Sequence, residues 1–153
     1  MKSHLILFLT CIFLFLLGSC KKDKGFECFK GNGDQTTECF LLDQFSKIKI
    51  ESHFMIYLIP DSINKAEITA GENIISGIKC NTEEETLILE NNNRCNWVRK
   101  YEDIYITIHY NAIDEIIING ESMIFSEDTL EFDDLTINVF AELSNVELIL
   151  DCN

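Results

Sequence analysis

The amino-acid sequence predicts an all-β domain that follows a short N-terminal export segment. Two observations favour this fold class: apolar residues alternate with polar ones from Phe26 onward, and no later segment shows a sustained helical period. A third observation is a set of apolar positions that repeats within the last third of the chain. With 153 residues, 46% of them hydrophobic, the chain is long enough for one domain with its own core.

The N-terminal segment has the composition of a secretory signal. Lys2 lies in a short basic start, and the apolar run Leu5–Leu17 is shorter than a membrane-spanning helix requires. The run ends in Leu17-Gly18-Ser19-Cys20, which resembles the lipobox of bacterial lipoproteins. We therefore expect residues 1–19 to be a lipoprotein signal peptide and Cys20 to carry lipid. The alternative is an ordinary signal peptide or anchor in which this cysteine is incidental.

Lipidation of Cys20 would also determine where the protein resides. Several acyl chains on one residue supply the two-chain anchoring that makes membrane attachment stable. Residues 20–26 would then form a polar tether whose lysines lie close to anionic headgroups. We expect an outer-membrane lipoprotein of the Gram-negative cell envelope, and we leave open whether it faces the periplasm or the cell surface.

Residues 27–153 are predicted to form the β domain. The alternation is clearest in Ile104–Tyr110, which places isoleucines on one face of a strand and Tyr105, Thr107 and His109 on the other. Glu72–Ile78 is expected to hold at most one helical turn. The expected strands lie near 47–51, 54–59, 66–70, 87–90, 104–110, 116–118, 135–139 and 146–150, separated by turns at Pro60-Asp61-Ser62, Asn91-Asn92-Asn93, Asn119-Gly120 and Asp133-Asp134.

A shift of nineteen residues superimposes apolar positions of the C-terminal third on one another. It places Ile116 on Leu135 and Ile118 on Ile137, and further along it places Ile124 on Leu143 and Leu130 on Ile149. Recurrence at such an interval is typical of a β-solenoid, in which each coil buries its inner face against the next. The alternative is an antiparallel meander whose hairpins happen to match.

Five of the seven cysteines remain once Cys11 leaves with the signal and Cys20 takes lipid. Disulfides are expected in an oxidising compartment, and an odd count leaves at least one thiol unpaired. We predict that Cys28 forms a disulfide with Cys95, because both lie in polar segments that a covalent bridge would hold in place. A local bridge from Cys28 to Cys39 is the competing interpretation, and Cys80 is equally well explained as a small buried hydrophobic residue.

The charge balance excludes one class of partner. The chain has 12 Lys+Arg against 26 Asp+Glu, a formal net charge of −14, whereas binding to nucleic acid requires clustered basic residues. We interpret the acidic runs as solvated turns. Calcium would be the most credible cation for them, but no EF-hand spacing is present, and we predict no metal and no cofactor. These runs comprise Glu83, Glu84, Glu85, Asp128, Glu131, Asp133 and Asp134.

Few side chains are suited to catalysis. Only His53 and His109 remain after the signal, no Gly-x-Ser-x-Gly elbow is present, and we expect His109 to be solvated. We therefore predict that the protein is not an enzyme. The alternative is a carbohydrate-active enzyme in which two carboxyl groups of the acidic runs act as a pair.

The segment around the single tryptophan is a weak candidate for ligand contact. Trp97 lies close to Arg99 and Tyr101, and aromatic rings beside polar groups can stack on sugar rings. We favour the competing interpretation, in which the Trp97 side chain covers the open end of the solenoid and has a structural role.

Six segments, taken in order and spacing, resemble a known family. They are Phe45-Ser46-Lys47-Ile48-Lys49-Ile50, Phe54–Ile59, Ala70-Gly71-Glu72-Asn73-Ile74-Ile75, Leu87-Ile88-Leu89-Glu90, Asn93-Arg94-Cys95-Asn96-Trp97-Val98-Arg99 and Ile118-Asn119-Gly120. Over residues 27–153 the chain resembles the putative auto-transporter adhesin, head GIN domain family. The resemblance implies an envelope protein, in many members a lipoprotein, with a right-handed parallel β-helix-like fold.

Two features depart from the family pattern. Its repeated Gly-Ser-Gly turns are replaced here by Gly120-Glu121-Ser122 and Val139-Phe140-Ala141. The chain also stops at Asn153, where longer members continue, so we expect either a short or a truncated member whose last strand, Val146–Leu150, is an exposed apolar edge.

Signal and resemblance together predict a lipid-anchored, non-catalytic module of the cell envelope. We expect it to serve binding, adhesion or structure, with the membrane as one partner and an envelope glycan or protein as the other.

Overall fold

The described part of the chain is mostly β strand with almost no helix, which confirms the predicted all-β class. The structure is a computed structural model that describes residues 31–94, 103–132 and 134–151. The strands are β1 (Gln35–Leu41), β2 (Lys47–Ile50), β3 (Met55–Pro60), β4 (Lys65–Gly71), β5 (Ile78–Glu83), β6 (Thr86–Asn91), β7 (Tyr105–Tyr110), β8 (Glu115–Ile118), β9 (Met123–Leu130), β10 (Thr136–Val139) and β11 (Asn145–Leu150), and the short helix is α2 (Glu72–Ile75).

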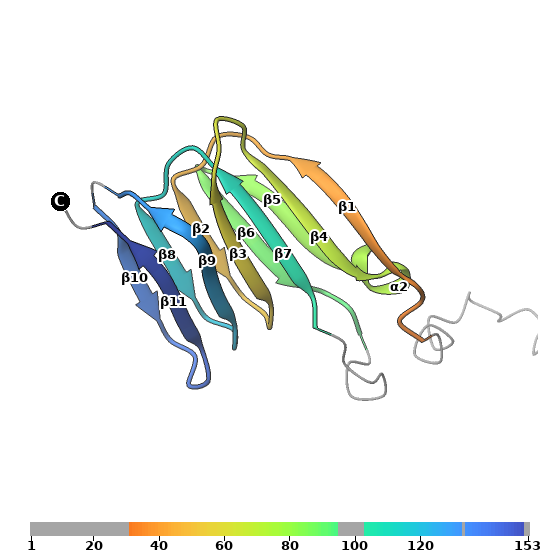
Figure 1. Ribbon diagram of the computed structural model, residues 1–153. Coiled ribbons are helices and arrows are strands. Elements are labelled where there is room, and N and C mark those ends of the chain that lie inside the picture. Colours follow the sequence, from red (N-terminus) through yellow and green to blue (C-terminus); the bar gives the residue numbers. More distant parts are fainter. Residues whose placement is uncertain (1–30, 95–102, 133, 152–153) are drawn as a thin grey trace, which may run out of the picture.

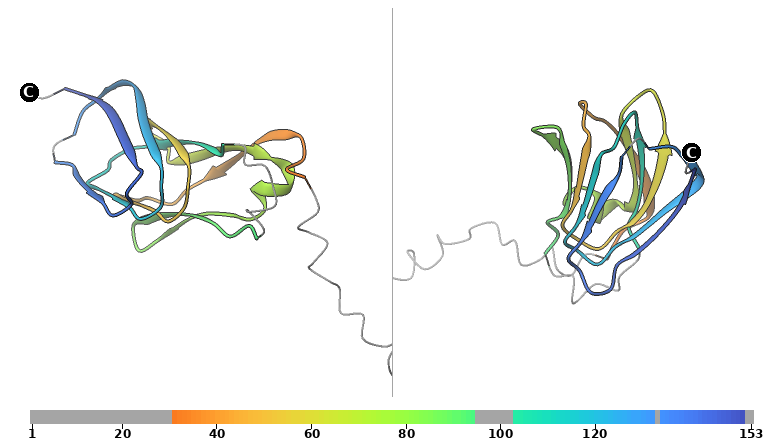
Figure 2. Two further views of the ribbon diagram at one scale, coloured as in Figure 1. Left: turned by 90° about the horizontal axis from the view of Figure 1, so that it is seen from below. Right: turned by 90° about the vertical axis from the view of Figure 1, so that its left-hand side faces the viewer.

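The strands form two sheets that face each other across one hydrophobic core. Sheet A has the order β1-β4-β7-β3-β9-β11, and sheet B has the order β10-β8-β2-β6-β5 (Figure 1). The two sheets are visible as separate layers in Figure 2. Because one face of each sheet is buried against the other, period-two alternation is the pattern that this architecture requires.

Four strand pairs lie next to one another in space, and parallel ladders of hydrogen bonds join each pair to its neighbour. Each of the pairs β2/β3, β6/β7, β8/β9 and β10/β11 contributes one strand to sheet B and the next to sheet A. The pair β2/β3 lies in the middle, with β6/β7 on one side and β8/β9 on the other. The spatial order of the pairs therefore differs from their order along the chain.

The parallel arrangement does not extend over the whole of residues 27–153. In sheet A, β4 pairs antiparallel with β7 and β1 pairs antiparallel with β4. In sheet B, β5 pairs antiparallel with β6. The expectation of a parallel β-helix throughout is wrong for this half of the domain. The two-residue hairpin after β5 makes β6 its antiparallel neighbour. The short turn after β3 reverses the chain, so β4 runs opposite to β3 and therefore also to β7, which is parallel to β3.

The predicted nineteen-residue repeat has the wrong register. In the β8–β10 ladder Ile116 lies opposite Ile137 and Ile118 opposite Val139, an offset of 21. In the β9–β11 ladder Ile124 lies opposite Val146, an offset of 22, and Leu130 opposite Leu150 after an irregularity, an offset of 20. The apolar positions do repeat, but the interval between them is 20 to 22 residues and not the predicted nineteen.

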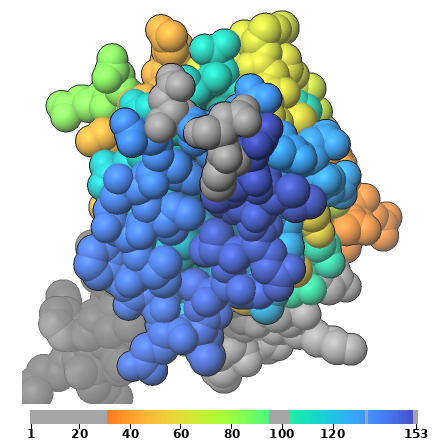
Figure 3. Space-filling view, turned by 60° about the vertical axis from the view of Figure 1, so that its left-hand side comes forward, coloured from red at the N-terminus to blue at the C-terminus, as the bar shows by residue number. Residues whose placement is uncertain are grey.

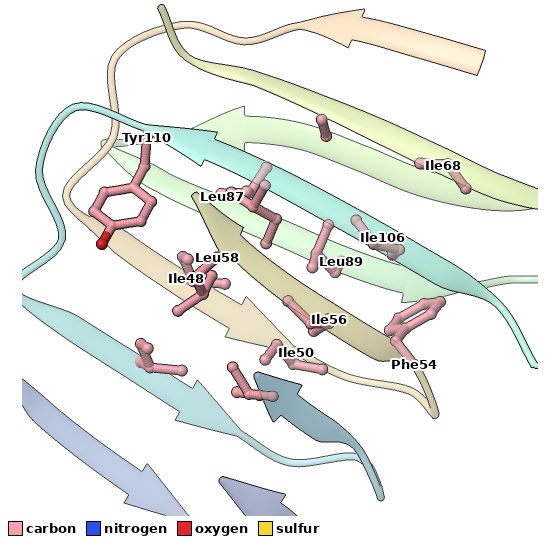
Figure 4. Packing of buried hydrophobic residues seen from close by; sticks show 14 of the residues in the cluster. Ile48, Ile50, Phe54, Ile56, Leu58, Ile68, Leu87, Leu89, Ile106 and Tyr110 are labelled. Atoms are coloured by element: carbon pink, nitrogen blue, oxygen red, sulfur yellow. The ribbon is translucent and has the colours of Figure 1, made fainter. Parts of the chain in front are cut away.

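The core consists of rows of aliphatic side chains that run across the strand pairs. One row in sheet B joins Leu87, Ile48 and Ile116, and the next joins Leu89, Ile50 and Ile118, all of which are fully buried. The facing rows of sheet A include Ile106, Ile56 and Ile124, and Figure 4 shows the two sets meeting between the sheets. Burial of each such side chain is worth about 1.5–3 kcal/mol.

Serines stack at the turns that carry the chain from sheet B to sheet A. The Ser52 hydroxyl accepts the backbone N–H of Asn91 at 3.0 Å. The buried Ser122 hydroxyl accepts the N–H of Phe54 at 3.2 Å and donates to the Ser52 carbonyl at 2.7 Å. Ser144 repeats the pattern on the next turn, where it accepts the N–H of Ser122 at 3.2 Å. Each serine thus satisfies backbone groups of the neighbouring turn that would otherwise be buried without a partner.

Gly120 allows these turns to approach closely. A Cβ at this position would lie 2.5 Å from the backbone nitrogen of Ser52, which no side chain tolerates. The predicted Asn119-Gly120 turn is therefore required by packing between turns as well as by local chain reversal.

Large apolar side chains are exposed at the end of the domain formed by β10 and β11, as expected for its last strand. Phe140 and Leu143 are 73% and 70% exposed, and Ile149 and Leu150 are 51% and 46% exposed. In Figure 3 the C-terminal strands, coloured blue, cover the face toward the viewer.

The hairpin between β5 and β6 holds backbone strain that a substitution should release. Glu84 and Glu85 have φ of 46° and 59°, the left-handed pattern of a two-residue type I′ turn, for which Asn-Gly is preferred. We predict that the double variant Glu84→Asn/Glu85→Gly raises the free energy of unfolding by about 1 kcal/mol, measured by urea denaturation. The double variant Glu84→Gln/Glu85→Gln removes the same charges without relieving the backbone. Equal stabilisation by both variants would show that charge, not strain, is the cause.

Candidate functional site

The residues singled out from the sequence for lipidation, disulfide formation and ligand contact lie outside the described residues. They are Cys20, Cys28, Cys95, Trp97, Arg99 and Tyr101. Of the cysteines that the structure does describe, Cys39 is an exposed free thiol and Cys80 a free thiol packed against the core. Burial raises the pKa of Cys80 to about 12, so this thiol is protonated at neutral pH and fits the interpretation as a small hydrophobic residue.

His109 is not the solvated residue that the strand pattern predicted. Its side chain is only 13% exposed, and its Nδ1 lies 3.2 Å from Oδ2 of Asp61. Its Nε2 lies 3.7 Å from Oε1 of Glu67. The reason is the sheet register, which places His109 on β7 between Ile59 of β3 and Lys65 of β4. Because an ionised carboxylate can only accept, the contact with Asp61 places a proton on Nδ1.

The two carboxylates beside His109 are stabilised in their ionised forms. The pKa of Glu67 is lowered, chiefly by the hydrogen bond that the Lys65 ammonium donates to it at 2.9 Å and also by His109. The pKa of Asp61 is lowered chiefly by the backbone N–H of Ile63, with a smaller contribution from His109. Both groups are largely solvated, so these effects are modest in energy. They fix the position of the imidazole more than they stabilise the fold.

A groove of about 400 Å³ lies beside this cluster on the outer face of sheet A. Its walls come from four neighbouring strands, β4, β7, β3 and β9. The residues that line this sheet A groove are Tyr57, Leu58, Ile59, Glu67, Thr107, His109 and Glu127.

Tyr57, which lines the sheet A groove, belongs to an aromatic pair. Tyr57 and Phe125 are directly opposite each other in the β3–β9 ladder, and their rings stack with centroids 5.5 Å apart. Both are half-buried although they point away from the core, because each ring covers part of the other. Tyr57 lies within the predicted strand at 54–59, but nothing local to Phe125 in the sequence indicates that the two rings meet.

A second, acidic cleft of about 520 Å³ lies where the β7–β8 and β9–β10 connections meet the end of β11. Glu131 and Asp134 of the predicted acidic run lie here with Asp114 and Asp151. The ring of Phe132 stacks on the buried Tyr110 at 6.1 Å, and burial raises the pKa of Tyr110 to about 12. The other predicted run is not part of this cleft, since Glu83 of that run accepts hydrogen bonds from Lys79 and Asn81 on β5.

Two further observations concern metals and membranes. Within the described ranges, no group of three or more His, Cys, Asp or Glu side chains is arranged to hold a metal ion. In the same ranges, no helix is long and apolar enough to cross a membrane.

Fold and groove together define a class of protein: a two-sheet β domain with stacked parallel strand pairs and a groove on one outer face. The chain belongs to the family described as "putative auto-transporter adhesin, head GIN domain", whose model matches residues 44–153. This confirms the family resemblance of the sequence. No curated protein matches the chain.

Solved structures share the fold. A putative adhesin from Bacteroides fragilis superimposes with a TM-score of 0.66 at 20% identity, covering 77% of this chain and 53% of its own. A putative lipid binding protein from Parabacteroides distasonis gives a TM-score of 0.64 at 18% identity, with 79% and 53% coverage. A putative adhesin from Parabacteroides merdae gives 0.58 at 20% identity, with 71% and 45% coverage. The chain thus spans about half the length of these structures.

The carboxylate–histidine cluster predicts a specific acid dependence of stability. The pKa of Glu67 is lower in the folded chain than in the unfolded one, so its stabilisation is complete above the unfolded pKa and is lost as the pH falls through the folded pKa. We predict that Glu67→Gln flattens the fall in unfolding free energy between about pH 5 and pH 3, measured by urea denaturation. Glu127→Gln is the matched control, because the Glu127 carboxylate has no partner among the described residues. An unchanged slope in Glu67→Gln would contradict the assignment.

Proposed function

We propose that this chain is a lipid-anchored, non-catalytic binding module of the cell envelope. In this proposal residues 1–19 are a lipoprotein signal peptide, Cys20 carries the lipid in the outer membrane, and residues 20–26 tether the β domain. The observation that carries the binding function is the sheet A groove, where Tyr57 of the aromatic pair lies beside polar groups that have no partner among the described residues.

The position of the groove favours recognition of a ligand. Its side chains project from the middle of a six-stranded sheet, where neighbouring strands hold the backbone on both sides. Side chains on such a scaffold keep their geometry without a ligand, which lowers the entropic cost of binding. We further propose that the parallel strand pairs form a short β-solenoid, since each pair stacks in register on the next.

Family membership supports adhesion, and the groove supports a non-catalytic role. The family and two of the similar structures are described as adhesins, which suggests an envelope or surface protein. The carboxylates of Asp61 and Glu67 lie beside the two ring nitrogens of His109, a residue of the groove, which leaves the imidazole poorly placed to exchange protons with a substrate.

One similar structure is described as a putative lipid binding protein. The groove of this chain is a poor fit for an acyl chain, because Glu67, Glu127 and His109 would be desolvated without new partners.

The anchor is tested by metabolic labelling with a palmitate analogue in a Gram-negative host. We expect wild-type protein to take up label in the membrane fraction and Cys20→Ala to lose it. Cys11→Ala is the matched control, since it removes a thiol of the same leader and should leave labelling intact. Equal label in Cys20→Ala, or none in the wild type, would show that the chain is not a lipoprotein.

A further inference from the structure

We infer that the sheet A groove binds a sugar ring that is uncharged or carries an amine. The inference rests on the proposed function, because it names the ligand of that same groove. It depends on three features: the aromatic pair, the unpaired polar side chains and the sign of the local charge.

The ring of Tyr57 offers an apolar surface of the kind on which a pyranose ring can lie. Tyr57 lines the groove, and its ring stacks on that of Phe125 with centroids 5.5 Å apart and an interplanar angle of 29°, so Phe125 supports the ring of Tyr57 in its position. One face of a pyranose presents mainly C–H groups, whose partial positive charge suits the negative face of an aromatic ring. Neither ring is needed to fill the core, which lies on the opposite face of the sheet.

The groove also presents acceptors and donors that nothing in the described chain uses. The hydroxyls of Tyr57 and Thr107 and the carboxylate of Glu127 have no hydrogen-bond partner among the described residues. Sugar hydroxyls both donate and accept, so they would satisfy these groups at once. A volume of about 400 Å³ lies within the range of small-molecule sites, about 300–1,000 Å³.

A peptide could not bind at this groove by adding a strand to the sheet, which is a common way in which sheets recognise peptides. β7 and β3, which form the floor of the groove, both have two paired neighbours. No backbone edge is therefore free there for an added strand, so a peptide would gain no main-chain ladder.

The charge around the groove excludes acidic glycans. Glu67 and Glu127 line it and Asp61 contacts His109 of its wall, whereas Lys65 is already paired with Glu67. A uronate, sulfate or phosphate would meet like charge without a free cation to offset it. The positively charged amine of an amino sugar would be attracted to the same carboxylates.

The experiment measures binding of the full chain, purified from membranes in detergent, to four immobilised oligosaccharides: a cello-oligomer, an N-acetylglucosamine oligomer, a glucosamine oligomer and a galacturonate oligomer. We expect binding to at least one of the first three and none to the last. Tyr57→Ala should weaken binding about tenfold, the effect of losing roughly 1.4 kcal/mol, and Tyr57→Phe should keep most of it. Leu41→Ala, an exposed apolar residue of the same sheet outside the groove, should bind like the wild type.

Three results would overturn the inference: no binding to any of the first three probes, preferential binding to galacturonate, or wild-type affinity in a folded Tyr57→Ala. Glu127→Ala provides a second variant and should also weaken binding. A parallel assay with Bacteroides fragilis envelopes, treated with periodate or with protease, separates this inference from the proposed function. Groove-dependent binding that survives periodate but not protease would overturn the sugar and leave the binding function. No groove-dependent binding in either assay would overturn both.

Discussion

The alignment of aliphatic rows across the strand pair β2/β3 is the constraint on which the rest of the structure depends. Ile48 and Ile50 in sheet B and Ile56 in sheet A each have an apolar residue beside them on both neighbouring pairs. A slip of one residue would turn every one of these side chains to the solvent face, so the rows fix the register of both sheets at once. The stacked serines of the turns then hold the same register at the edge of the core.

The inner rows of aliphatic side chains determine which residues lie on the outer face of sheet A. Because Ile56 and Leu58 point into the core, Tyr57 and Ile59 must point outward beside Thr107 and His109 of β7. The same register brings Phe125 opposite Tyr57 and Glu67 next to His109. The groove is thus a consequence of how the core is packed, and its shape should not change when a ligand binds.

Much of the fold follows from local pattern, and the rest does not for identifiable reasons. Period-two runs and turn residues locate eight strands and the helical turn at α2, but β1, β5 and β9 were missed because polar residues such as Glu38, Lys79 and Glu127 hide their alternation. The repeat was misregistered because a shift of nineteen and one of twenty-one preserve the same inward and outward faces. The groove could not be predicted, since its side chains come from four strands, and Asp61 meets His109 across 48 residues of chain.

The most direct measurement of the central role of β2/β3 is native-state hydrogen exchange followed by NMR. If these strands hold the two sheets in register, their hydrogen-bonded amides should exchange only through global unfolding, with the same free energy as those of β6 to β8. Amides of β1, β10 and β11, which lie at sheet edges, should exchange through smaller local openings. Exchange from β2 and β3 as fast as from those edge strands would contradict the account.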